Sequence, residues 1–152
     1  MIVYATLDDA EILTDIALKS KAYWGYSKDI IESWRDDLTV SEQMFTDYTI
    51  CKYMFENEVA GFYILERANI RTSFLKFLFI SPDFIKKGIG HQLLNHAIDY
   101  CKEGSCAILN VLSDPNAESF YAKYGFEVIA LVESSIPGRT LPEMELLFPE
   151  NQ

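Results

Sequence analysis

The chain has little of the material from which metal sites and disulfide frameworks are built. It contains three cysteines and two histidines in 152 residues. Cys51, Cys101 and Cys106 are odd in number and show no C-x-x-C spacing. We therefore expect them to be reduced and mostly buried, and to pack as small hydrophobic side chains. Because only His91 and His96 stand beside them as further ligands, no zinc or other metal site is expected.

Long apolar runs and repeats are also missing. No run approaches the roughly 18 to 20 residues that a membrane span needs. The first residues, "MIVYATLDDAEI", lack the basic start and apolar region of a signal peptide, which predicts a cytoplasmic location with no membrane partner. Since low-complexity and linker-like stretches are absent too, residues 1–152 are expected to form a single domain.

Basic residues are scarce. The chain has 13 Lys and Arg against 23 Asp and Glu, a net charge of −10. Such a field repels nucleic acid and favours cationic or neutral partners. An anionic ligand must therefore find a local positive pocket, and Lys86–Lys87 is the clearest basic pair in the middle of the chain.

Hydrophobic periodicity predicts strands alternating with helices. A short strand at residues 2–5 precedes a helix from about Asp8, and Ser27 is placed to cap a second helix that runs past Trp34. A meander of three strands, a long helix after Gly88, a strand, a short helix and two more strands follow. The expected strands are at residues 48–55, 59–66, 73–80, 106–112 and 126–132, with a last strand at "MELLF". The short helix is expected at residues 116–123. The order is β-α-α-β-β-β-α-β-α-β-β, an α/β (α+β) fold with a mixed sheet and helices on its faces.

Two glycines lie in "IKKGIGHQLL", between a strand end and a helix start. Amides at a helix N-terminus form an anion site, and Gly88 and Gly90 would allow a phosphate to approach the backbone closely. The Rossmann pattern fails because Leu93 stands at its third glycine position, and the Walker pattern fails because no lysine follows the second glycine. This stretch alone leaves two alternatives, a phosphate cradle or a simple turn with solvated lysines.

A second cluster follows the next strand, in "DPNAESFYAKYGF". Asp114 and Pro115 read as the start of a short helix, and Gly125 suits its C-terminal end. The Tyr121 hydroxyl can donate a proton to a thiolate of comparable basicity, so a general-acid role is chemically sensible. The alternative is that Tyr121 only packs its ring and hydrogen-bonds nearby.

Together the two clusters resemble the acetyl-CoA-binding core of the GNAT superfamily of N-acetyltransferases. The resemblance covers Val59 to Val132 and combines G-x-G with A-x-x-F-Y-x-x-x-G-F. It implies a GNAT fold, whose sheet is mixed and mostly antiparallel, and acetyl-CoA as co-substrate. It also implies direct transfer of the acetyl group to an amine, with no metal and no covalent enzyme intermediate. Homodimers are common in such folds, and the sequence does not fix an interface.

The resemblance also assigns residues to CoA. The family binds the pyrophosphate through the loop Q/R-x-x-G-x-G/A, and this chain has Ile85 at the first position. The phosphate cradle then falls on Lys86, Lys87, Gly88, Ile89, Gly90 and His91. The preceding strand would offer backbone groups to the pantetheine arm and the thioester carbonyl at Leu78, Phe79 and Ile80. Asn110, Asn116 and Phe120 would lie near the CoA arm, whereas Asp114 replaces an asparagine that many members carry.

In this scheme Tyr121 is the general acid that protonates the departing CoA thiolate. A backbone amide of the splayed strand that points at the thioester carbonyl would stabilise the oxyanion. The base that deprotonates the amine is not identified, and Glu66, Asp83 or a water chain would serve.

Two loops are expected to flank the acceptor amine, by the same resemblance. "SKAYWGYS" offers Trp24 and Tyr26 as one wall, and the stretch Glu133 to Glu145, read as a loop bounded by Pro137 and Pro142, offers Arg139 for a carboxylate or phosphate. Packing of Trp24 and a solvated Arg139 are equally good alternatives. A bound carboxylate would favour a small zwitterion, whereas the overall charge favours a cationic amine.

The expected function is transfer of an acetyl group from acetyl-CoA to a primary amine of a small molecule. The first alternative is a CoA-binding sensor or assembly module that has lost transfer. The second is a protein or peptide N-acetyltransferase, which would need an open groove.

Overall fold

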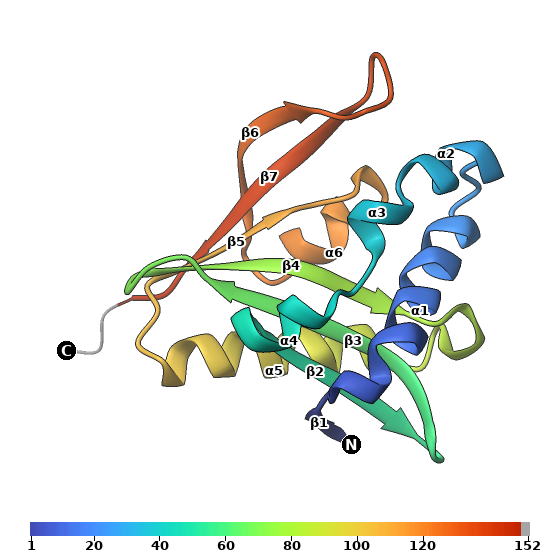
Figure 1. The fold of residues 1–152 in the computed structure, drawn as a ribbon. Coiled ribbons are helices and arrows are strands. Elements are labelled where there is room, and N and C mark those ends of the chain that lie inside the picture. The colour runs from blue at the N-terminus through green and yellow to red at the C-terminus, as the bar shows by residue number, and fades with distance from the viewer. Residues whose placement is uncertain (150–152) are drawn as a thin grey trace. The chain divides into compact units, whose positions relative to one another are not determined.

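The structure is a computed structural model that describes residues 1–149. Its strands follow the hydrogen-bonding order β1-β2-β3-β4-β5-β7-β6 (Figure 1). The pair β4–β5 is parallel, and the pairs β1–β2, β2–β3, β5–β7 and β6–β7 are antiparallel. This is the mixed α/β arrangement that the sequence predicts.

The elements have the following bounds: β1 Ile2–Tyr4, η1 Leu7–Asp9, α1 Ala10–Tyr23, α2 Lys28–Ser33, α3 Arg35–Leu38, α4 Glu42–Asp47, β2 Thr49–Phe55, β3 Glu58–Arg67, β4 Thr72–Ile80, η2 Pro82–Phe84, α5 Ile89–Glu103, β5 Ile108–Leu112, η3 Pro115–Ala117, α6 Glu118–Ala122, β6 Glu127–Glu133 and β7 Thr140–Leu147.

Internal contacts divide the chain into two compact units. The first contains Met1–Leu65 and Phe77–Ala97, and the second contains Glu66–Lys76 and the chain from Ile98 onward. The strand β4 and the helix α5 therefore each contribute residues to both units. The expectation of a single domain stays a prediction.

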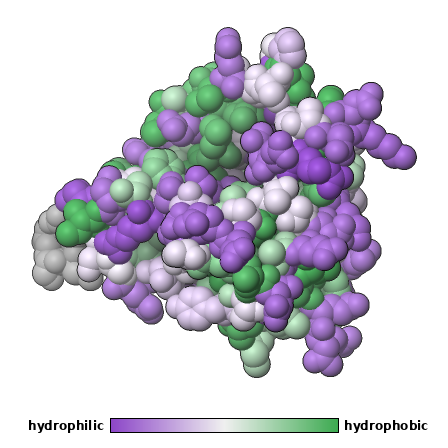
Figure 2. Space-filling model, in the orientation of Figure 1, coloured by the Kyte–Doolittle hydropathy of each residue, from purple (hydrophilic) through white to green (hydrophobic). Residues whose placement is uncertain are grey.

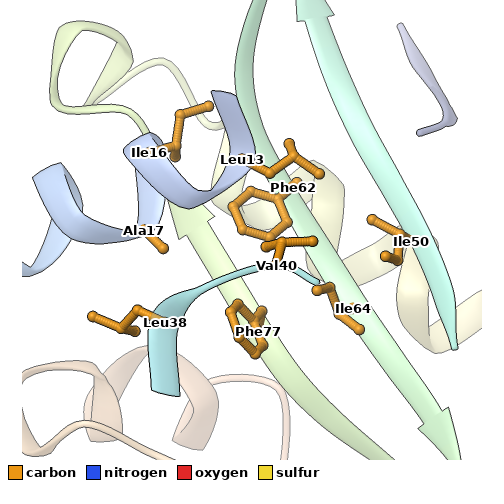
Figure 3. Packing of buried hydrophobic residues seen from close by; sticks show 9 residues of the cluster. All are labelled: Leu13, Ile16, Ala17, Leu38, Val40, Ile50, Phe62, Ile64 and Phe77. Atoms are coloured by element: carbon orange, nitrogen blue, oxygen red, sulfur yellow. The ribbon is translucent and has the colours of Figure 1, made fainter. Parts of the chain in front are cut away.

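In the first unit, an apolar core joins α1 to one face of the strands (Figure 3). Leu13, Ile16 and Ala17 come from the inward stripe of α1 and are almost fully buried. They pack with side chains of β2, β3 and β4, among them Phe62 and Phe77. Because these apolar residues are spaced three and four positions apart, they lie on one face of α1, and this face turns to the core.

The opposite face of β3 in this unit belongs to α5. A side-chain carbon placed on Gly61 would lie 3.2 Å from the Leu93 side chain, and the hydroxyl of the next outward residue, Tyr63, lies 2.7 Å from Nδ1 of His96. Since alternate residues of a strand point to opposite faces, β3 is covered on both sides. Its run of buried residues from Ala60 to Leu65 reflects this double cover.

The expected second helix is interrupted. Ser27 caps α2 as predicted, with its side chain accepting a hydrogen bond from the Ile30 amide at 3.2 Å. The helix then breaks at Trp34, which separates α2 from α3. A further short helix, α4, follows where the sequence showed no clear periodic stripe.

In the second unit, β7 is longer than expected and contains a proline. The stretch from Glu133 to Glu145 was predicted to be a loop bounded by Pro137 and Pro142, and this is wrong because Pro142 lies inside β7 opposite Leu131 of β6. Proline lacks the amide that most strand positions need, which is why its presence argues against a strand. Its carbonyl is used, since it accepts a hydrogen bond from the Ser113 amide at 2.9 Å.

The last strand of the order, β6, is exposed along its whole length. All seven of its residues are exposed, including Leu131 at 67%, and Figure 2 shows apolar residues gathered over this strand. Its pairing with β7 shifts register between Val128 and Ala130, which marks a bulge. Glutamates occupy both ends of the strand, at Glu127 and Glu133.

All three cysteines are free and buried, as their number and spacing predict. Burial raises the pKa of the Cys51 thiol. In the second unit, burial and the neighbouring Cys106 raise the pKa of Cys101 to about 12. The Cys106 thiol donates to the Ile108 carbonyl at 2.9 Å. Cys51 and Cys101 are therefore protonated at neutral pH, and all three sulfur atoms are shielded from solvent, which is typical of structural cysteines.

Two further findings concern residues 1–149. None of their helices is both long and apolar enough to cross a membrane. No group of three or more His, Cys, Asp or Glu side chains among them could hold a metal ion.

The close approach of β3 and β4 at Gly61 yields a stability prediction. A Cβ at this position would lie 2.8 Å from the Phe79 carbonyl oxygen, a backbone atom that cannot move without shifting β4. We expect Gly61→Ala to lower the free energy of unfolding by about 1–3 kcal/mol, measured in urea. Gly104→Ala is the matched control, because its Cβ would come within 3.0 Å of the end of the flexible Arg67 side chain and would meet backbone atoms only at ordinary contact distance, 3.5 Å or more. Equal stability of the two variants would contradict this account of Gly61.

The buried cysteines yield a reactivity prediction. The folded chain should show almost no reaction with a disulfide reagent at about pH 8 within minutes, because thiolate is scarce and the sulfur atoms are shielded. The same protein in urea should react at all three cysteines. Free CoA added to the folded sample serves as the control that the reagent is active. Rapid labelling of a cysteine in the folded protein would show that its burial is wrong.

Candidate active site

In the first unit, the loop before α5 adopts the backbone conformation that its glycines predict. Lys86 and Gly88 both have positive φ, 67° and 76°, and α5 begins directly afterward at Ile89. Ile89 is buried and anchors the helix start, while Gly88 is exposed, with no atom within 4 Å of the place where a Cβ would be. Gly88 is thus required for its left-handed backbone, and the space above it is open.

The two lysines of this loop have different surroundings. The Lys87 ammonium lies 5.3 Å from the centroid of the Phe55 ring, which in turn packs against Phe84 at 5.4 Å. Lys86 is exposed and holds the unusual backbone conformation. Both lysines therefore directly precede, along the chain, the first turn of α5, whose amides have no acceptor within the helix.

The strand β4 continues beyond its pairing with β5. Their register runs from Thr72 opposite Ile108 to Leu75 opposite Val111, and β4 goes on to Ile80. In the first unit, the rings of Phe77 and Phe79 each lie 6.1 Å from that of Phe62. Since these side chains turn toward the core, the part of Leu78–Ile80 suited to contact a ligand is the backbone.

Asn110 in β5 has a buried polar atom that the described residues leave unsatisfied. Its side-chain oxygen, Oδ1, is buried and has no hydrogen-bond partner among residues 1–149. Buried polar atoms are normally paired, and one that is not calls for a missing donor. An amide N–H of a bound molecule would supply that donor.

Tyr121 is buried in an aromatic cluster of the second unit. Its ring lies 5.3 Å from Phe120 and 5.4 Å from Phe126, both edge-on. Burial, and next the negative charge of Asp114, raise the pKa of its hydroxyl well above the ordinary value. Tyr121 therefore keeps its proton throughout the neutral range and can act as a donor.

Asp114 is the centre of a polar network in the same unit. One carboxylate oxygen accepts from the Asn116 amide and from the Asn116 side chain, each at 2.9 Å. The other accepts from the Arg139 guanidinium at 3.1 Å, and both partners of this ion pair are largely buried. The residue that replaces the family's usual asparagine thus caps η3 and holds Arg139.

The connection from β6 to β7 is a turn closed by its own hydrogen bonds. The Ser134 amide donates to the Arg139 carbonyl at 2.9 Å, and Arg139 donates through its side chain to Ser134 Oγ at 3.1 Å. The Ser134 hydroxyl also accepts from the Ile136 amide at 2.9 Å. Arg139, expected to bind an acceptor's acid group, here fastens the turn to Asp114.

The turn between α1 and α2 differs in detail from the expectation. Trp24 is half exposed and stacks edge-on against Tyr23 at 5.6 Å, so it faces solvent. Tyr26 instead packs against Trp34, with centroids 4.9 Å apart.

Sequence reasoning missed Lys21, whose ammonium lies over the rings of Tyr26, Trp34 and Phe79. The signal that could have drawn attention to it is a lysine two residues before the aromatic run "YWGY".

The candidate bases differ in environment. Glu66 lies 3.7 Å from the Lys76 ammonium in the second unit, and Asp83 is exposed in η2 of the first. The choice of base therefore stays open.

In chemical terms, the first unit offers a helix N-terminus with two lysines, and the second a protonated tyrosine and an unsatisfied amide oxygen. These are the donors and acceptors that a phosphate and a peptide-like amide need. The first unit thus has a region suited to a phosphate, and the second has groups suited to an amide and to proton donation.

Comparisons with solved structures show the same fold. A PaiA N-acetyltransferase from Thermoplasma acidophilum, solved in complex with coenzyme A, superposes with a TM-score of 0.79 at 23% identity, covering 97% of this chain and 98% of its own. The ribosomal-protein-S18-alanine N-acetyltransferase of Escherichia coli gives 0.75 at 21% identity, covering 100% and 96%. An aminoglycoside 6'-N-acetyltransferase complexed with coenzyme A gives 0.73 at 15% identity, covering 100% and 99%.

The family comparison goes further than the fold. No curated protein matches the chain. The sequence model of the acetyltransferase (GNAT) domain, however, matches residues 24–147, which is most of the chain. The resemblance inferred from the glycine loop and the Tyr121 cluster is therefore confirmed: the chain belongs to the GNAT family of acetyltransferases, which use acetyl-CoA as acetyl donor.

Proposed function

We propose that this acetyltransferase acts on the primary amine of a small molecule. The observation that carries the proposal is the closed β6–β7 turn, whose hydrogen bonds between Ser134 and Arg139 and ion pair to Asp114 leave it compact. A peptide acceptor would need an open groove lined by backbone groups, whereas the backbone groups of this turn pair with one another.

In this proposal, backbone groups make the main contacts with acetyl-CoA, and side chains add to them. The amides of Gly88, Ile89 and Gly90 at the start of α5 bind the pyrophosphate, with Lys86, Lys87 and His91 around them. The backbone of Leu78, Phe79 and Ile80 contacts the pantetheine arm and the thioester. Asn110 accepts a hydrogen bond from a pantetheine amide through its unsatisfied oxygen. Asn116 and Phe120 lie near the arm.

The transfer step is a direct displacement. The neutral amine attacks the thioester carbonyl carbon, the carbon–sulfur bond breaks, and Tyr121 gives its proton to the departing sulfur. The attacking nitrogen loses one of its protons to water or to a base as the amide forms, and the tyrosinate regains a proton from solvent, so that the products are the N-acetylated amine and CoA thiol. Burial raises the pKa of Tyr121, so it holds its proton at neutral pH until the thiolate forms.

Two other functions are weighed against this one. A CoA-binding module without transfer would not need a proton donor for the thiolate, so the effect of Tyr121→Phe on turnover distinguishes the two functions. The fold itself does not choose an acceptor, since its neighbours include both a ribosomal-protein and an aminoglycoside N-acetyltransferase. The cytoplasmic location, the lack of a nucleic-acid partner and a homodimeric state stay predictions from the sequence.

The phosphate cradle is tested by calorimetric titration of acetyl-CoA. We expect micromolar binding by the wild type and loss of binding in Gly88→Glu, because the new carboxylate would occupy and repel at the anion site. Gly88→Ala is the matched control: it carries the same backbone strain at positive φ without the charge or the reach. Binding that survives Gly88→Glu in a folded protein would show that the loop is only a turn.

The role of Tyr121 is tested by Tyr121→Phe. Removal of a general acid is expected to lower kcat by about 10²–10⁴-fold while acetyl-CoA still binds. Because the pKa of Tyr121 is raised, its acid form is present at neutral pH and is lost only above the ordinary tyrosine value of about 10. The wild-type rate of CoA release should therefore show no alkaline fall from this group below that pH. Full activity of Tyr121→Phe would remove it from the mechanism.

A further inference from the structure

One face of the sheet in the second unit carries three glutamates. The strands β5, β7 and β6 lie side by side in this order (Figure 1), and Glu145 of β7 is opposite Asn110 of β5 and also opposite Glu127 of β6. Directly opposed residues of an antiparallel pair point to the same face of the sheet, so these three side chains share a face. Glu143, two residues before Glu145, shares it too. We call Glu127, Glu143 and Glu145 the acidic patch.

The carboxylates of the acidic patch have no partner of opposite charge. The residues that alternate with them point to the core, where Val111 and Met144 are almost fully buried. On the patch side, Glu143 and Glu145 are half-buried and Glu127 is exposed. Among residues 1–149, no lysine or arginine pairs with any of the three carboxylates, and none of them accepts a hydrogen bond.

This arrangement costs stability as long as no cation is bound. Like charges directly opposite each other on neighbouring strands repel, which applies to Glu127 and Glu145. A half-buried carboxylate has also lost part of its hydration without gaining a partner. The Cβ atoms of cross-strand neighbours lie about 5 Å apart, and residues two positions apart on a strand about 7 Å. An ammonium placed between these carboxylates would relieve both costs.

An independent feature marks the same face as a place for a ligand. Oδ1 of Asn110 is buried and has no hydrogen-bond partner among residues 1–149, so it calls for a donor. In the proposed function that donor is an amide of the pantetheine arm. The arm then lies on the face that carries the acidic patch, with Glu145 directly across the ladder from Asn110. An acceptor that reaches the thioester of this arm has the patch beside it.

We propose that the acidic patch binds a positive charge of the acceptor, so that the substrate is an amine that carries a second ammonium group, such as a diamine. The inference rests on the proposed function and names its substrate class. One amine of the substrate is neutral and attacks the thioester, while the other stays protonated and is held by Glu143 and Glu145. A carboxylate at the same place would be repelled.

The inference decides between the two kinds of acceptor that the sequence leaves open. Arg139, the residue expected to hold an acid group, is in an ion pair with Asp114, so its charge is largely offset. The acidic patch has no such counter-charge among the described residues. The local charges of the second unit therefore favour a cationic acceptor over a zwitterionic one, in agreement with the net charge of −10.

The test compares acceptors that differ only at the end remote from the reacting amine. The panel consists of diaminoalkanes, alkylamines and ω-amino acids of matching unbranched chains, from propyl to octyl. The rate of CoA release from acetyl-CoA is measured for the full chain at one pH. We expect at least about a tenfold higher kcat/KM for the diamine than for the alkylamine of the same length, and the lowest value for the amino acid.

Variants then locate the effect. Because the amines differ in their own pKa, the deciding quantity is the change in the diamine-to-alkylamine ratio between the wild type and a variant. Glu143→Gln and Glu145→Gln should each lower this ratio, chiefly through a higher KM for the diamine, whereas Glu145→Asp keeps the charge and should largely preserve it. Glu133→Gln is the matched control: it removes the same charge from the same hairpin, but Glu133 is opposite Thr140 on the other face, so the ratio should not change.

Two further measurements separate binding from turnover and from folding. Calorimetric titration of diaminobutane into protein saturated with CoA should show binding that both glutamine variants weaken. Urea unfolding should give the glutamine variants a midpoint equal to or above that of the wild type, because each removes a repelled charge. A lower midpoint would show that the carboxylates hold the sheet together, which would count against a role in binding.

The remaining outcomes also count against the inference. A ratio that is the same in the wild type and in both glutamine variants would overturn it while the proposed function stands. A fall of equal size in Glu133→Gln would assign the preference to the overall charge of the chain and not to the acidic patch. Binding of acetyl-CoA without transfer to any amine would overturn the proposed function, and this inference with it.

Discussion

The arrangement of the first unit depends on the contact between the backbones of β3 and β4 at Gly61. A Cβ there would lie 2.8 Å from the Phe79 carbonyl oxygen and equally close to the Ile80 side chain. The absence of a side chain lets β4 approach β3, and this sets where Phe79 and Ile80 stand. The start of α5 packs on the same place through Leu93, so the strand end and the helix start are positioned by one glycine.

The contact at Gly61 also positions the regions on either side of Phe79 within the same unit. The backbone beyond Phe79 leads through η2 to the left-handed Lys86 and Gly88, which present the first amides of α5. The ring of Phe79 points the other way, toward α1, and helps to hold Lys21. One strand segment thus separates a region suited to phosphate from the aromatic packing around Lys21.

In the second unit, several polar side chains are buried, and most of them have hydrogen-bond or ion-pair partners. Asp114 is satisfied by Asn116 and Arg139, and its remaining charge helps to keep the Tyr121 hydroxyl protonated. Asn110 is the exception, since its oxygen has no partner among the described residues. An unsatisfied atom of this kind costs stability and so calls for an explanation, and a bound ligand that donates to it would supply one.

The sequence was informative where the controlling interactions are local. The stripe of α1, the Ser27 cap and the turn at Gly88 each depend on residues within a few positions, and the structure has all three. The break at Trp34 and the strand through Pro142 depend on partners far along the chain, such as the Ser113 amide that uses the Pro142 carbonyl. The contact of the Lys21 ammonium with the Phe79 ring was missed for the same reason, because Phe79 lies far from Lys21 in sequence and periodicity cannot bring them together.

The exposed strand β6 has a consequence for the behaviour of the protein in concentrated solution. An unpaired strand edge with apolar side chains invites other chains to add to it. Here the bulge near Val128 distorts the edge, and Glu127 and Glu133 would oppose like charges in an incoming copy of the same strand. The bulge protects the edge sterically, and the glutamates protect it by charge repulsion. Acid and high salt weaken only the charge repulsion. Self-association through this edge should therefore depend on pH and salt more strongly than the stability of the fold does.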